Sequence, residues 1–168
     1  MLSKEMTKAL NDQMVFEIHS GYIYLAMAAK LEKLKLPGMA HWMRVQAGEE
    51  LGHAERFRKF LNDHDADVEY AALAKPEIVG TRPVQVFEQA LKHEEAVTVR
   101  INRLYGQALT EKAYSAVNFL DWFVDEQVEE EKSVRDIIDR LNLADGAGEA
   151  VLYLNDELGG RGSEESAG

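Results

Sequence analysis

The chain has 168 residues, of which 46% are hydrophobic, which fits one domain with a substantial core. Its formal net charge of -11 at pH 7 argues against nucleic acid or an anionic membrane as a partner. It contains no cysteine, which excludes disulfides, thiolate zinc sites and iron–sulfur clusters. No apolar run approaches the ~18 residues of a membrane span and the first residues lack the apolar core of a secretory signal, so we expect a cytoplasmic protein.

Apolar residues recur at helical spacing along most of the chain. We expect helices over residues 4–34, 39–64, 83–109, 111–143 and 149–158. The first helix is expected to stop at Leu36-Pro37-Gly38, because proline cannot continue a helix and glycine turns freely. Pro83 suits the first turn of the third helix behind Thr81, and Thr110-Glu111 is expected to cap and begin the fourth.

The lengths of the connections predict how these helices are arranged. Short links make the first and second helices antiparallel neighbours, and likewise the third and fourth. Residues 65–82 have no helical stripe and are long enough to run the length of the bundle, so the second and third helices are expected to be parallel. We therefore predict an all-α four-helix bundle with one long crossover connection and a short fifth helix, as a single domain over residues 1–158. Residues 159–168 are expected to form a disordered tail.

Each of the four long helices carries a polar residue within or beside its apolar stripe. These residues are Glu17, Glu50, His53, Glu94, Gln127 and Glu130. Glu50 follows Glu17 by 33 positions, Gln127 follows Glu94 by 33, and Glu94 follows Glu17 by 77. A single acid on an apolar stripe usually extends to solvent or pairs with a lysine, but four at compatible heights, without buried cationic side chains to match, are costly to bury. The pattern therefore predicts a site for two divalent ions.

The ligand types favour particular metals. Carboxylate oxygens with one imidazole suit iron or manganese better than zinc. Glu50 and His53 are three residues apart and share one helical face, and Glu50 is central enough to bridge two ions. The corresponding step on the fourth helix runs from Gln127 to Glu130. Because an amide is a poor ligand, we expect the second ion to be held loosely and to turn over.

Other polar residues flank these ligands. Glu49, Glu126 and Glu129 form either a third metal position or simply a solvated acidic face. Tyr24 lies on the side of Glu17, where it could hydrogen-bond a ligand, donate an electron or only pack. The remaining histidines are expected at the surface: His19, His41, His64 and His93.

Three stretches of the chain resemble the prokaryotic non-haem ferritins: residues 11–24, 49–54 and 122–131. The resemblance extends from the N-terminus to about Leu158 and implies a ferritin-like fold. It implies a first iron site of Glu17, Glu50 and His53, and a second of Glu94 and Glu130 that shares Glu50, with Gln127 hydrogen-bonding nearby. It also implies an extra iron site of Glu49, Glu126, Glu129 and Glu130, with Tyr24 beside the paired site.

The same resemblance implies a ferroxidase that serves iron storage and detoxification. Fe(II) would be oxidised by O2 or H2O2 at a di-iron centre and stored as ferric oxyhydroxide inside a homo-oligomeric cage, usually of 24 subunits. No haem is expected, because Gly52 stands where bacterioferritins carry the haem-binding methionine. The alternatives are a di-iron peroxidase or oxidase without storage, and a structural bundle whose acids bind cations adventitiously.

Overall fold

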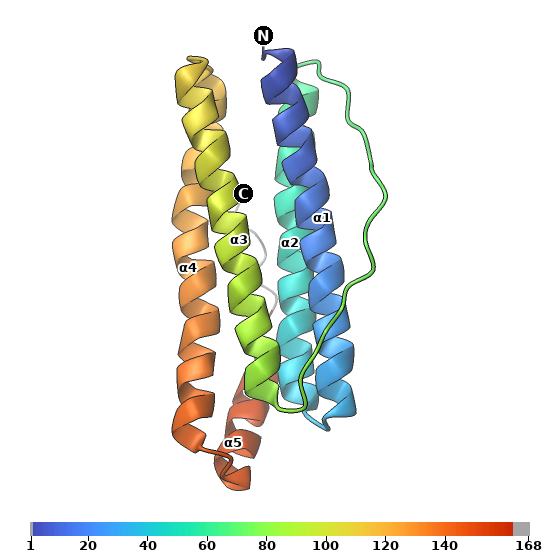
Figure 1. The fold of residues 1–168 in the computed structure, drawn as a ribbon, viewed down its shortest axis with the longest axis vertical. Coiled ribbons are helices and arrows are strands. Elements are labelled where there is room, and N and C mark those ends of the chain that lie inside the picture. Colours follow the sequence, from blue (N-terminus) through green and yellow to red (C-terminus); the bar gives the residue numbers. More distant parts are fainter. Residues whose placement is uncertain (1, 163–168) are drawn as a thin grey trace.

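Five helices form the computed structural model, which describes residues 2–162. They are α1 (Lys4–Lys33), α2 (Pro37–Asp63), α3 (Pro83–Thr110), α4 (Tyr114–Ala144) and α5 (Gly148–Gly159). The segment 64–82 runs along the outside of the bundle from one end to the other, beside α1, so that α2 and α3 point the same way (Figure 1). The predicted all-α bundle with one long crossover and a short fifth helix is confirmed. Within the described part of the chain, no helix has the length and apolar character needed to span a membrane.

Two helix boundaries differ from the prediction for reasons of turn chemistry. Pro37 begins α2 instead of only ending α1, because the N–H that proline lacks has no intrahelical partner at the first helical position. Thr110 is the last residue of α3, and Glu111 is its C-cap. The chain then turns through Lys112, which has a positive φ of 56°, and α4 begins only at Tyr114.

The apolar core is divided into two clusters along the bundle. One cluster surrounds Met27, Met43 and Phe87, and the other surrounds Phe57 and Phe123 together with apolar residues near the start of α1. Burying each large apolar side chain contributes about 1.5–3 kcal/mol, so each cluster supports its own end of the bundle. Between them, all four long helices contribute buried polar side chains.

The short helix α5 packs against α2 and α4 at one end of the bundle (Figure 1). Asn155 of α5 accepts hydrogen bonds at Oδ1 from the backbone N–H groups of Gly38 and Met39, at 2.9 and 3.1 Å. Because the N-cap residue Leu36 makes no side-chain cap, Asn155 takes over that role for α2. The residues just after α5 do not form the expected tail: Arg161 contacts α2. Residues 163–168 of the predicted tail lie outside the described residues.

Candidate metal centre

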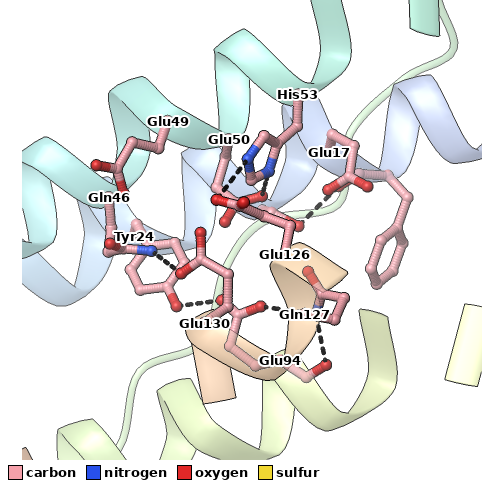
Figure 2. A network of polar contacts seen from close by, with 12 residues as sticks. Glu17, Tyr24, Gln46, Glu49, Glu50, His53, Glu94, Glu126, Gln127 and Glu130 are labelled. Carbon is pink, nitrogen blue, oxygen red and sulfur yellow. Dashed lines mark hydrogen bonds and ion pairs between the residues drawn. The ribbon is translucent and has the colours of Figure 1, made fainter. Parts of the chain in front are cut away.

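The polar layer brings together the six residues that the sequence analysis singled out (Figure 2). Helix α1 supplies Glu17, α2 supplies Glu50 and His53, α3 supplies Glu94, and α4 supplies Gln127 and Glu130. All six are buried, and Glu17 and Glu94 have no exposed surface. Along the helices the layer lies between the two apolar clusters: on α3, for example, Ala90 and Val97 flank Glu94 and belong to one cluster each.

Glu17, Glu50 and His53 form one compact group. Ligand atoms from the three residues all lie within 4.8 Å of one another, and His53 Nδ1 is 3.5 Å from Glu50 Oε2. The imidazole is held edge-on against Trp122 and Phe123. This arrangement presents two carboxylates and one imidazole nitrogen to a common point.

Two carboxylate oxygens of this group lack a hydrogen-bond donor among the described residues: Glu17 Oε2 and Glu50 Oε1. The other oxygen of Glu17 accepts a hydrogen bond from Gln13 Nε2 at 2.8 Å. A buried charged oxygen without a partner is costly, and such atoms in native structures usually indicate a function or an absent ion. A divalent cation would satisfy both oxygens, so the residues of this group fit a metal.

Glu94 is held by two donors in the same layer. Its Oε1 accepts a hydrogen bond from the Tyr24 hydroxyl (Figure 2), and its Oε2 lies 3.3 Å from Gln127 Nε2. The Gln127 amide also reaches the backbone oxygen of Glu94 and Thr98 Oγ1, at 3.2 and 3.3 Å. Gln127 therefore acts as a hydrogen-bond donor to Glu94.

Glu130 belongs to a second group of potential ligands, with Glu126 and His53. His53 Nε2 is 4.0 Å from Glu126 Oε1, so the two ring nitrogens face carboxylates on different helices. Glu130 Oε2 accepts a hydrogen bond from Gln46 Nε2 at 2.7 Å. Glu94 joins neither of the two compact groups found among the described residues.

The acids predicted for a third position are not gathered together. Glu126 lies beside His53 and Glu130, whereas both oxygens of Glu49 accept hydrogen bonds from Arg161 Nη2, at 3.0 and 2.9 Å. Glu129 is exposed on α4 and is absent from both groups in the described part of the chain.

Burial controls protonation within the layer. It raises the pKa of Glu17 and of Glu94 to about 7, although the Gln13 and Tyr24 hydrogen bonds to them act in the opposite direction. Burial, followed by the charges of Glu94 and Glu17, raises the pKa of Glu50 well above its usual range. The pKa of Glu130 is also raised well above its usual range, first by burial and then by the charge of Glu94. These shifts reflect negative charge that lacks a compensating cation.

Burial also lowers the pKa of His53 to about 4, with the nearby Arg56 charge adding to the effect. The imidazole is therefore neutral at pH 7 and has a lone pair available for a metal. The pKa of Tyr24 is raised well above its ordinary value, first by burial and then by the charge of Glu94. Tyr24 thus stays a neutral donor to Glu94.

The sequence analysis missed four residues that support this layer: Gln13, Gln46, Arg100 and Arg161. Gln13 and Gln46 are separated by the same 33 positions as Glu17 and Glu50, which is a signal that could have identified them. His93, which was predicted at the surface, is half-buried. Its ring stacks on Phe16 at 5.4 Å, and burial lowers its pKa to about 4.

A four-helix bundle with one crossover and a buried layer of carboxylates and histidine defines the class of ferritin-like di-metal carboxylate proteins. The chain belongs to the ferritin family: residues 7–144 match its family model, described as a ferritin-like domain.

Relatives of similar length support this membership. A Staphylococcus aureus protein named bacterial non-heme ferritin is 36% identical over 165 residues, which cover 98% of this chain and 99% of that protein. A Campylobacter jejuni protein of the same name is 38% identical over 157 residues, covering 94% and 93%. The structure described as an open pore ferritin from Archaeoglobus fulgidus superposes with a TM-score of 0.95 and 40% identity, covering 96% of this chain and 100% of that one.

Proposed function

We propose that this chain is a cytoplasmic non-haem ferritin subunit that oxidises Fe(II) and stores the Fe(III) as a ferric oxyhydroxide mineral. The mineral would be held inside a homo-oligomeric cage, of 24 subunits as the resemblance implies. The protein would thereby serve iron storage and detoxification. The observation that most supports the proposal is the pair of buried, unsatisfied oxygens on Glu17 and Glu50 beside the neutral His53. Iron is the substrate of this site.

In this proposal the two halves of the layer each bind one Fe(II). Glu17, Glu50 and His53 hold the first ion, Glu94 and Glu130 hold the second, and Glu50 bridges the two. Positioning two ions side by side makes a two-electron step possible. Two Fe(II) each lose one electron, one O2 gains both and takes up two protons to become H2O2, and hydrolysis of the Fe(III) returns protons to solvent. H2O2 can replace O2 as the oxidant, accepting two electrons and two protons to become two waters.

The neighbouring residues have supporting roles. The step from Gln127 to Glu130 offers one carboxylate, as a Glu-x-x-His step does, but an amide in place of the imidazole. Because an amide is the poorer ligand, the ion in this half exchanges more readily. Tyr24 orients Glu94 through their hydrogen bond. Glu126, with His53 and Glu130, is the best-placed part of a third iron position, to which Glu49 and Glu129 would contribute after rearranging.

The ferroxidase proposal is tested by mixing the protein anaerobically with Fe(II) and then rapidly with O2, following ferric absorbance. We expect the fast phase to saturate near two Fe(II) per chain. Glu50→Ala should slow this phase the most, by about tenfold or more, because it removes a ligand from both ions. Glu55→Ala is the matched control, since Glu55 lies on the same helix but is exposed and pairs with Arg58. A Glu50→Ala protein as fast as wild type would refute the bridging role.

A further inference from the structure

We propose that Arg161, just after α5, is a positioning residue for the metal centre: it orients Gln46 toward Glu130 and neutralises Glu49. This inference rests on the proposed metal-binding function of the layer. It predicts that the Arg161 side chain strengthens metal binding at Glu130 and weakens metal binding at Glu49.

Arg161 is fixed by several contacts with one face of α2. Its Nη1 donates to Gln46 Oε1 at 2.7 Å, and its Nη2 donates to both oxygens of Glu49. The guanidinium carbon lies 4.8 Å from the centre of the Trp42 ring. The backbone oxygen of Arg161 is 2.8 Å from His41 Nε2. The planar guanidinium can thus serve an amide and a carboxylate simultaneously, which the single ammonium of a lysine does less well.

The contact with Gln46 determines which way its amide faces. Arginine can only donate hydrogen bonds, so the oxygen of Gln46 must face Arg161 and its NH2 group must face the layer. That NH2 group donates to Glu130 Oε2 at 2.7 Å (Figure 2), and Gln46 is completely buried. Arg161 therefore fixes one oxygen of Glu130 as an acceptor through Gln46.

The same arrangement occurs independently on the other side of the layer. Arg100 Nε donates to Gln13 Oε1 at 2.7 Å, and Gln13 Nε2 donates to Glu17 Oε1 at 2.8 Å. The second oxygen of Glu17 is one of the two unsatisfied oxygens of the first group. An arginine–glutamine pair thus holds one oxygen of a carboxylate and leaves the other directed at the proposed metal.

The contact with Glu49 has the opposite consequence. A guanidinium on both oxygens of Glu49 supplies the positive charge that a cation would otherwise supply there. A metal ion that binds Glu49 with Glu126 must displace Arg161. We therefore expect Arg161 to favour metal binding at Glu94 and Glu130 and to oppose binding at Glu49.

Co(II) binding to the assembled protein, followed by calorimetry and by the visible absorption of Co(II), separates these effects without redox chemistry. The first equivalent is assigned by its loss in His53→Ala, and the second by its loss in Glu94→Gln. In Arg161→Ala we expect the Kd of the first equivalent to be unchanged and that of the second to rise about tenfold. The Kd of a third equivalent should fall about tenfold, with a change in the Co(II) spectrum.

Two further variants separate positioning from general stability. Arg161→Lys keeps a positive charge near Glu49 but cannot also donate to Gln46 as the planar guanidinium does. The second equivalent of Co(II) should therefore bind more weakly, while binding of the third equivalent stays as weak as in the wild type. Arg140→Ala is the matched control, because Arg140 ties α4 to α5 through two hydrogen bonds to Glu157 and lies outside the layer. It should leave all three equivalents unchanged.

The inference is overturned if Arg161→Ala binds Co(II) as wild type does. It is also overturned if all equivalents weaken together, as they would when Arg161 only stabilises α5. A wild-type protein that binds no Co(II) at the His53-dependent site would refute the proposed function itself, and this inference with it.

Discussion

Glu17 and Glu94 show how burial without a compensating cation changes the protonation of individual residues in the layer. Each is buried among other acids, and burial raises the pKa of each to about 7. Without metal, these carboxyls therefore hold protons at pH values where the same groups in the unfolded chain, with a pKa near 4.5, are ionised. Metal binding must expel these protons, so affinity for the metal and stability of the metal-free fold respond to pH in opposite directions.

We predict that the metal-free protein loses stability as pH rises from about 4.5 through about 7. In that window the raised pKa values of four buried carboxyls, Glu17, Glu50, Glu94 and Glu130, give the folded state more protons than the unfolded state. The lowered pKa values of His53 and His93 act in the opposite direction but involve fewer groups, so the free energy of unfolding falls with pH. The melting temperature measured in EDTA between pH 5 and 8 checks this expectation. The double variant Glu17→Gln, Glu94→Gln should show a flatter dependence, and a wild-type melting temperature that increases across this range would contradict the account.

At the same scale, the sequence was sufficient to identify the buried acids of the layer but not the residues that support them. Glu50 and Glu130 could be recognised because acids at core positions break an apolar stripe. Gln46 repeats the 33-residue spacing from Gln13, but a glutamine in a helix is usually solvated and does not stand out from a stripe. Arg161 gave no signal, because its contact with Gln46, 115 positions away, exists only in the folded chain. The composition around Arg161 favoured disorder, but its contacts with α2 outweigh that local preference.

At the scale of elements, α5 completes the start of α2. Asn155 satisfies two N–H groups that a helix N-terminus leaves without partners. The approach is so close that a Cβ atom on Gly38 would lie 1.8 Å from the backbone oxygen of Asn155. The same contact brings the end of α5, and therefore Arg161, to the face of α2 that carries Gln46 and Glu49.

We predict that Asn155→Ala lowers the free energy of unfolding by about 1–2 kcal/mol, the usual cost of losing a helix cap. Gly38→Ala should cost more, because its methyl group meets backbone that cannot move without displacing α5. Urea denaturation measures both. Gly106→Ala on α3 is the control: nothing lies within 4 Å of its added Cβ, so it should stabilise by up to about 1 kcal/mol. A Gly38→Ala protein as stable as wild type would show that α5 does not dock as described.

Helix boundaries were harder to predict than the helices themselves. The long helices follow from apolar periodicity, which packing of the two core clusters preserves. Proline is compatible both with the end of one helix and with the start of the next, so Pro37 could not be assigned from its type. The turns at Lys35 and Lys112 use positive φ values of 65° and 56° without a glycine, and local sequence does not indicate them.

At the scale of the whole molecule, the fold keeps a costly polar layer in place by flanking it with two apolar clusters. The clusters stabilise the bundle on both sides of the acids, so the fold can carry the cost of burying these polar side chains. Four helices converge on this layer, and the crossover 64–82 lets α2 and α3 run parallel within it (Figure 1). The bundle is therefore built around a layer of acids whose negative charge a bound cation would balance.

The most direct test of the central claim is aerobic addition of Fe(II) in large excess, followed by gel filtration with iron and protein measured in the same fractions. We predict that far more iron than the paired site can hold stays soluble and elutes with a large assembly of this chain. Iron that saturates near two per chain while the excess precipitates would contradict storage and favour a di-iron redox enzyme.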